Sequence, residues 1–75
     1  MSESRKQIAV DNILIAAERC FGLNGPSISI QKVASEAGMS KQALMHHFPS
    51  KKQLVDAVWE RVIERAQRFQ PALLR

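Results

Sequence analysis

The residues best suited to contact another molecule stand together in the middle of the chain. Lys41, Gln42 and Ala43 follow directly after Ser40, a residue type that commonly caps a helix. A lysine ammonium suits guanine O6 and N7, a glutamine amide suits adenine N6 and N7, and an alanine methyl group can touch the thymine methyl group. The pattern predicts an exposed helical turn that reads base edges, with ordinary helix surface as the alternative.

Further candidates flank this turn on both sides. Lys51 falls in the first turn of another expected helix, where a cation is unfavourable without an external anion, and a tolerated exposed lysine is the alternative. Serines that begin helices can also donate to phosphate. The residues predicted to read bases are Gln31, Lys41, Gln42, Ala43 and His46. Those predicted to bind phosphate include Ser29, Lys32, Ser40, His47 and Lys51.

The charge balance favours a polyanionic partner. The 75 residues carry a formal net charge of +4, and the segment from Lys32 to Lys52 holds four lysines against the single acid Glu36. A basic patch on one face is the electrostatic footprint of a nucleic-acid-binding protein. A solvated basic surface would have the same composition, so it is the coincidence with the base-reading pattern that favours double-stranded DNA.

Composition and motifs argue against several other classes. The single cysteine, Cys20, excludes an internal disulfide and argues against a zinc finger. His46 and His47 are adjacent, so on a helix they diverge by about 100° and do not readily share one metal ion. With no catalytic set of side chains, we expect no enzyme activity, metal or cofactor. No secretory signal or membrane-spanning run is visible, so the expected location is the cytoplasm.

Hydrophobic periodicity predicts an all-α fold. A first helix is expected over residues 7–23, because apolar residues recur there every three or four positions, and Gly25 should end it. Ser29 should cap a second helix. Its apolar residues, with those of the following turn and third helix, should face inward: Ile30, Val33, Ala34, Ala37, Met39, Leu44 and Phe48.

A tight turn should join the second helix to the third. Gly38 allows the positive φ that such a turn needs, and Ser40 should cap a third helix over Lys41–His47. From Ser40 onward we expect outward side chains at Lys41, Gln42, Ala43, Met45 and His46. This is the layout of a helix-turn-helix whose second helix can enter a major groove.

A fourth helix should begin after Ser50, which forms a capping pattern with Gln53. One apolar stripe along it contains Leu54, Val58 and Val62. The adjacent stripe contains Val55, Trp59, Ile63 and Ala66. Because two stripes are too wide for one partner, we expect Phe69 at an interface with missing helices, and Trp59 either there or in the local core.

The ordered set of these residues resembles the N-terminal DNA-binding domain of the tetracycline-repressor (TetR) family. The residues that carry the resemblance run from Ile8 to Val58, and they include Ile13, Leu14, Ala16, Ala17, Phe21, Gly25, Ser29, Val33, Ala34, Ala37, Gly38, Met39, Ser40, Leu44, His47, Phe48, Ser50, Lys51 and Leu54. The resemblance implies a three-helix, homeodomain-like head and a fourth, linker helix that leads into a larger domain. That domain would bind a small-molecule effector and make the full-length protein a homodimer.

Two positions depart from the family pattern. Members usually have tyrosine at Met45, which the resemblance places among the phosphate-binding residues, and a thioether replaces the phenol here. Members often have glycine at Gln42, whereas a glutamine can bond adenine edges. The DNA sequence that is bound should therefore differ from that of typical members.

These observations predict three parts and one main function. Residues 1–6 should be a mobile arm, residues 7–70 the DNA-binding domain, and residues 71–75 the start of a missing effector and dimerisation domain. The predicted function is that of a sequence-specific transcriptional regulator, a repressor by analogy with the family. The alternative is a helical protein-interaction module that docks through the apolar stripe of the fourth helix without binding DNA.

Overall fold

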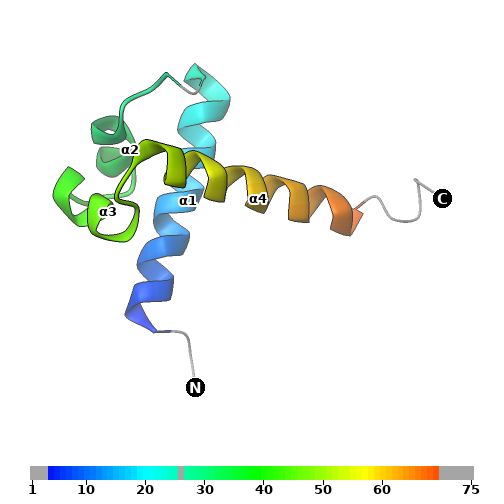
Figure 1. Ribbon diagram of the computed structural model, residues 1–75, viewed down its shortest axis with the longest axis horizontal. Coiled ribbons are helices and arrows are strands. Elements are labelled where there is room, and N and C mark those ends of the chain that lie inside the picture. The colour runs from blue at the N-terminus through cyan, green and yellow to red at the C-terminus, as the bar shows by residue number, and fades with distance from the viewer. Residues whose placement is uncertain (1–3, 26, 70–75) are drawn as a thin grey trace.

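Four helices make up the described part of the computed structural model, which covers residues 4–25 and 27–69 (Figure 1). They are α1 (Arg5–Asn24), α2 (Ile30–Glu36), α3 (Lys41–His47) and α4 (Lys51–Phe69). Helix α1 contacts both α2 and α4, and α2 contacts α3. The all-α prediction is confirmed for these residues. No helix among them is long and apolar enough to cross a membrane.

Helix α1 begins two residues earlier than the sequence periodicity predicts. The Ser4 hydroxyl accepts a hydrogen bond from the Gln7 backbone N–H at 3.2 Å and so caps the helix at Arg5. Arg5 and Lys6 are therefore helical, and the prediction of a mobile arm through residue 6 is wrong for them. The rest of that predicted arm, residues 1–3, and residues 70–75 lie outside the described residues.

The turn between α2 and α3 is closed by backbone hydrogen bonds. Gly38 has a φ of 75°, as predicted. Its N–H donates to the Ser35 carbonyl at 3.1 Å, and the Met39 N–H donates to the Ala34 carbonyl at 3.0 Å. These two bonds satisfy carbonyls at the end of α2 and form a Schellman motif, in which a residue with positive φ ends the helix. The turn thereby fixes the direction in which α3 starts.

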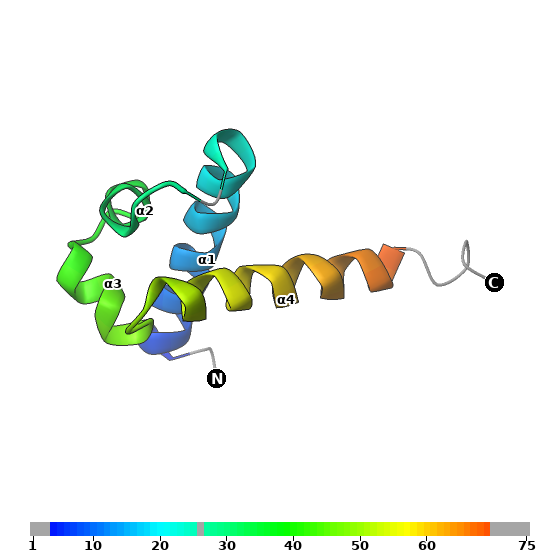
Figure 2. The same ribbon diagram turned by 45° about the horizontal axis from the view of Figure 1, so that its top comes forward.

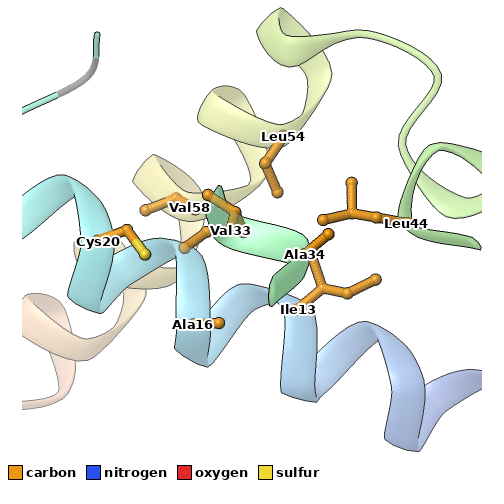
Figure 3. Packing of buried hydrophobic residues seen from close by; sticks show 9 residues of the cluster. Ile13, Ala16, Cys20, Val33, Ala34, Leu44, Leu54 and Val58 are labelled. Atoms are coloured by element: carbon orange, nitrogen blue, oxygen red, sulfur yellow. The ribbon is translucent and has the colours of Figure 1, made fainter. Parts of the chain in front are cut away.

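A small apolar core joins all four helices (Figure 3). The four largest fully buried side chains are Ile13, Val33, Leu44 and Leu54, each from a different helix. Ala34 is also fully buried, as predicted, and its small side chain lets α2 lie close to its neighbours. Cys20 is buried as a small core residue, and this burial raises the pKa of its thiol.

Helix α4 leaves the bundle after its first turns (Figures 1 and 2). Leu54 and Val58 are buried and Val62 packs against the core, which confirms the first predicted stripe. On the second stripe, Trp59 is 60 % exposed and Ile63 is 51 % exposed. Trp59 is therefore not a core residue of the described chain. The side chain of Phe69 lies outside the described residues.

Candidate nucleic-acid interface

Helix α3 presents its first turn to the outside. Lys41, Gln42 and Ala43 are exposed, whereas Leu44 is fully buried. The Ser40 hydroxyl accepts a hydrogen bond from the Ala43 N–H at 3.0 Å, so the cap holds this turn in place. Both ribbon views place α3 at the edge of the molecule, opposite the free half of α4 (Figures 1 and 2). The exposed turn thus belongs to a helix that Leu44 anchors to the core.

Serine caps begin all three of the later helices. The Ser29 hydroxyl accepts from the Lys32 N–H at 3.1 Å, and the Ser50 hydroxyl accepts from the Gln53 N–H at 3.2 Å, as Ser40 does for α3. The first turns of α2, α3 and α4 contain no acidic residue. Because the N-terminal end of a helix is its positive end, these three ends have no local carboxylate to balance them.

The four lysines of the basic segment differ in their partners. Lys32 lies 3.6 Å from a Glu36 carboxylate oxygen, and Lys52 lies 2.9 Å from that of Asp56. Within residues 4–25 and 27–69, Lys41 and Lys51 form no ion pair. Lys51 is half-buried in the first turn of α4, and Lys41 is exposed. These two ammonium groups are the ones left available to an external anion.

Helix α3 contradicts one predicted orientation. Met45 does not point outward, because it is half-buried and packs against the core. The rotation of α3 that buries Leu44 also turns the neighbouring position 45 inward. This burial leaves little of the thioether for a phosphate contact, and methionine has no N–H or O–H to donate.

The two histidines at the end of α3 take different positions. His46 is exposed, as predicted, and His47 is half-buried. Their rings stand edge to face at 83° with centroids 5.6 Å apart. The Nδ1 atom of His47 is buried and has no hydrogen-bond partner in the described structure. Gln31 is exposed on α2, two positions after the Ser29 cap.

One cluster was not predicted from the sequence. Glu18 on α1 accepts hydrogen bonds from Arg65 on α4 at 2.6 and 2.8 Å and from Arg61 at 3.4 Å. The Arg65 hydrogen bonds hold the pKa of the Glu18 carboxyl below its ordinary value, against the opposing effect of its partial burial. This cluster joins α1 to α4, the two long helices that form the frame of the bundle.

Comparisons with known proteins agree with this architecture. The model of the family described as "Bacterial regulatory proteins, tetR family" matches residues 13–58. The chain belongs to the TetR family. Two uncharacterized HTH-type transcriptional regulators, from two strains of Mycobacterium tuberculosis, are each 38% identical over 69 residues. That match covers 91% of the chain but only 34% of each relative. No solved structure matches the sequence significantly.

Proposed function

We propose that this TetR-family chain is the sequence-reading head of a transcriptional regulator, and that it inserts α3 into the major groove of double-stranded DNA. The observation that carries the proposal is the exposed Lys41–Ala43 turn on a helix capped by Ser40 and anchored by Leu44. A major groove admits a helix, and these three side chains suit base edges. Gln31 on α2 and His46 on α3 are also exposed and complete the proposed base-reading set.

Contacts with the DNA backbone would hold α3 in register. The capped N-termini of α2, α3 and α4 lack acidic residues, which supports phosphate binding at Ser29 and Ser40. Lys51 and Lys41 have no carboxylate partner in the described chain, so DNA would not have to break an ion pair to engage them. Lys32 would exchange Glu36 for a phosphate. Because the Nδ1 atom of His47 is buried, His47 would donate a hydrogen bond to phosphate through its other ring nitrogen. Met45 is the weakest of the proposed phosphate-binding residues, because it has no N–H or O–H to donate.

The larger organisation is proposed from the family alone. The chain spans about a third of the length of the curated relatives that it matches. We therefore propose that residues 7–70 are the DNA-binding domain of a longer cytoplasmic protein, followed from residue 71 by an effector and dimerisation domain. That protein would act as a homodimeric repressor, would respond to a small molecule, and would need no catalytic residue, metal or cofactor in this head.

The decisive test is a comparison of Gln42→Ala with Gln67→Ala. Both positions are exposed glutamines, but Gln67 lies on the far half of α4. Duplexes should first be selected from a random pool with the wild-type chain, and each base pair of the selected site should then be substituted in turn. Gln42→Ala should cost about 1–3 kcal/mol on the selected site and relax the preference at one base pair. Gln67→Ala should leave the preference profile unchanged.

Two results would contradict the proposal in different ways. If the Gln42→Ala profile matched wild type at every base pair, Gln42 would not read a base. If the wild-type chain failed to shift any random duplex at low salt, DNA binding itself would be wrong, and the protein-interaction alternative would take its place. The exposed stripe around Trp59 and Ile63 is the observation that supports this second candidate.

A further inference from the structure

Helix α1 has an exposed side that none of the proposed DNA contacts uses. Ile8 and Ile15 on this side are 49 % and 46 % exposed, whereas isoleucine is usually buried. A groove of about 250 Å³ runs beside Ile15, between α1 and the end of α2. We refer to the surface formed by these parts as the α1–α2 face, and its residues are Ile8, Asn12, Ile15, Arg19, Glu36 and Ala37.

The α1 residues of this face form one stripe. Ile8, Asn12, Ile15 and Arg19 recur every three or four positions, so their side chains lie on one side of the helix. All four are exposed. A single exposed isoleucine needs no explanation, but two of them on one stripe beside a groove form a patch of the kind that a partner covers.

The charges of the α1–α2 face are balanced. Arg19 on α1 and Glu36 on α2 line the groove from its two sides. In the described part of the chain Arg19 forms no ion pair, and Glu36 pairs only with Lys32 of its own helix, at 3.6 Å. Such a face complements a copy of itself related by a two-fold axis, because Arg19 of one copy then meets Glu36 of the other. A partner of one charge sign would pair with only one of these two residues.

DNA binding would make the carboxylate of this face available. In the proposed complex Lys32 exchanges Glu36 for a phosphate, so Glu36 loses its only ion-pair partner among the described residues. Its side chain is 38 % exposed and can accept from an arginine of a neighbouring molecule. The chain has a net charge of +4, so two copies repel each other in solution, and bound phosphates reduce this repulsion. DNA therefore favours contact through the α1–α2 face in two ways.

We infer that the α1–α2 face is an interface between neighbouring copies of this chain on one duplex, in which Ile15 of each copy packs beside the groove of the other and Arg19 pairs with Glu36 across a two-fold axis. The inference rests on the proposed DNA binding and adds cooperativity to it. Two half-exposed isoleucines offer much less area than the about 800 Å² that each partner buries in a standard interface. The contact therefore forms only where DNA raises the local concentration of a second copy. It does not use the dimerisation domain proposed for the longer protein.

Duplexes with two sites test this inference. The selected site should be placed twice on one duplex, as inverted or as direct repeats, with the spacing changed by one base pair at a time. A duplex with one site gives the intrinsic affinity. On one inverted arrangement the second copy of the 75-residue chain should bind about tenfold more tightly than the first. Adding about five base pairs should abolish this effect, because half a turn moves the second copy to the other side of the duplex. Direct repeats should bind independently, since they cannot place two copies about a two-fold axis.

Charge reversal identifies the contact. Arg19→Glu and Glu36→Arg should each abolish cooperativity, and the double variant should restore it, because the pair then forms with its charges exchanged. Cooperativity is a ratio of two affinities of the same protein, so the effect of a variant on overall DNA affinity cancels. Glu60→Arg is the matched control, since it makes the same charge change at an exposed position of α4. Ile15→Ala should also reduce cooperativity, whereas Ile63→Ala, at a position of α4 that is 51 % exposed, should not.

The outcomes separate this inference from the proposed function. Failure of the chain to bind the single-site duplex would overturn the proposed DNA binding, and the inference with it. Binding to single sites with no cooperativity on any repeat would overturn the inference alone and leave the face to a different protein. Cooperativity that survives Arg19→Glu, or that the double variant fails to restore, would place the contact outside the α1–α2 face. A stable dimer in sedimentation without DNA would overturn the role given to the duplex.

Discussion

The two halves of this small bundle are stabilised in different ways. The short helices α2 and α3 are held by serine caps, a Schellman turn and two large buried side chains, Val33 and Leu44. The long helices α1 and α4 cross each other (Figure 1) and are tied by the Glu18 cluster with Arg61 and Arg65. Among the described residues, the ion pairs between helices therefore join α1 to α4. Lys41 and Lys51, the first residues of α3 and α4, form no ion pair there.

Because of this difference, the small bundle keeps charged side chains available for a partner. Local caps and one buried leucine fix α3 without using any of its exposed side chains. Glu18, Arg61 and Arg65 can pair with one another where α1 and α4 meet, because these three side chains contact no DNA in the proposed complex.

Truncation of Leu44 should remove the anchor of the reading half. Leu44 is fully buried, and Leu→Ala in a core typically costs about 2–5 kcal/mol. A small domain has little more than that in total, so Leu44→Ala should unfold at or near room temperature in a thermal melt followed by circular dichroism. Leu23→Ala, at a position that is 77 % exposed, is the matched control and should melt close to wild type. Similar melts for both variants would refute the assigned role of Leu44.

Removal of Lys51 should weaken DNA binding without changing the preferred sequence. Each neutralised phosphate contributes a slope of about −0.9 in log K against log salt, so Lys51→Ala should reduce the magnitude of the measured slope by about 1. Lys52→Ala is the control, because its ammonium is already paired with Asp56 at 2.9 Å. A titration against salt that gave both variants the same slope would remove the distinction drawn between free and paired lysines.

Loss of the α3 cap should separate stability from binding. Ser40→Ala should cost about 0.5–2 kcal/mol of unfolding free energy, because the Ala43 N–H loses its acceptor. Ser40→Asp should recover most of that loss, since aspartate also caps, but its charge should repel phosphate and lower DNA affinity. Ser4→Ala removes the same kind of cap from α1 and should affect stability alone. Equal affinity of the Ser40→Asp variant and wild type would place Ser40 away from the DNA.

The contrast between the halves also explains what could be predicted from the sequence. The α2–α3 half rests on local rules, so its caps, the positive φ of Gly38 and the bounds of α3 were predictable from residue types at short spacing. Even the early start of α1 had a local signal, because Ser4 and Gln7 have capping spacing. Met45 could not be placed, because its burial depends on the rotation of α3 against the core.

The frame was less predictable because its contacts join distant residues. Glu18 and Arg65 are 47 positions apart, and no spacing rule indicates that α1 and α4 cross where these side chains meet. The same crossing creates an apolar groove beside Gly22. The exposure of Trp59 depends on the angle between the two helices, so the sequence does not decide between core and interface for this residue.

The smallest expected effect tests whether the Glu18 cluster stabilises the frame. The folded-state pKa of Glu18 is lowered from 4.5, chiefly by its hydrogen bonds with Arg65, so its contribution to stability is present above the unfolded pKa and is lost as the pH falls through the folded one. Glu18→Gln should therefore melt slightly below wild type at neutral pH, and the gap should close in acid. The effect should be modest and weaken with salt, because the arginines are partly exposed. Glu64→Gln, on an exposed pair within α4 at 3.9 Å, is the control and should change less. A gap for Glu18→Gln that stayed constant from neutral to acidic pH would show that its carboxylate charge does not tie α1 to α4.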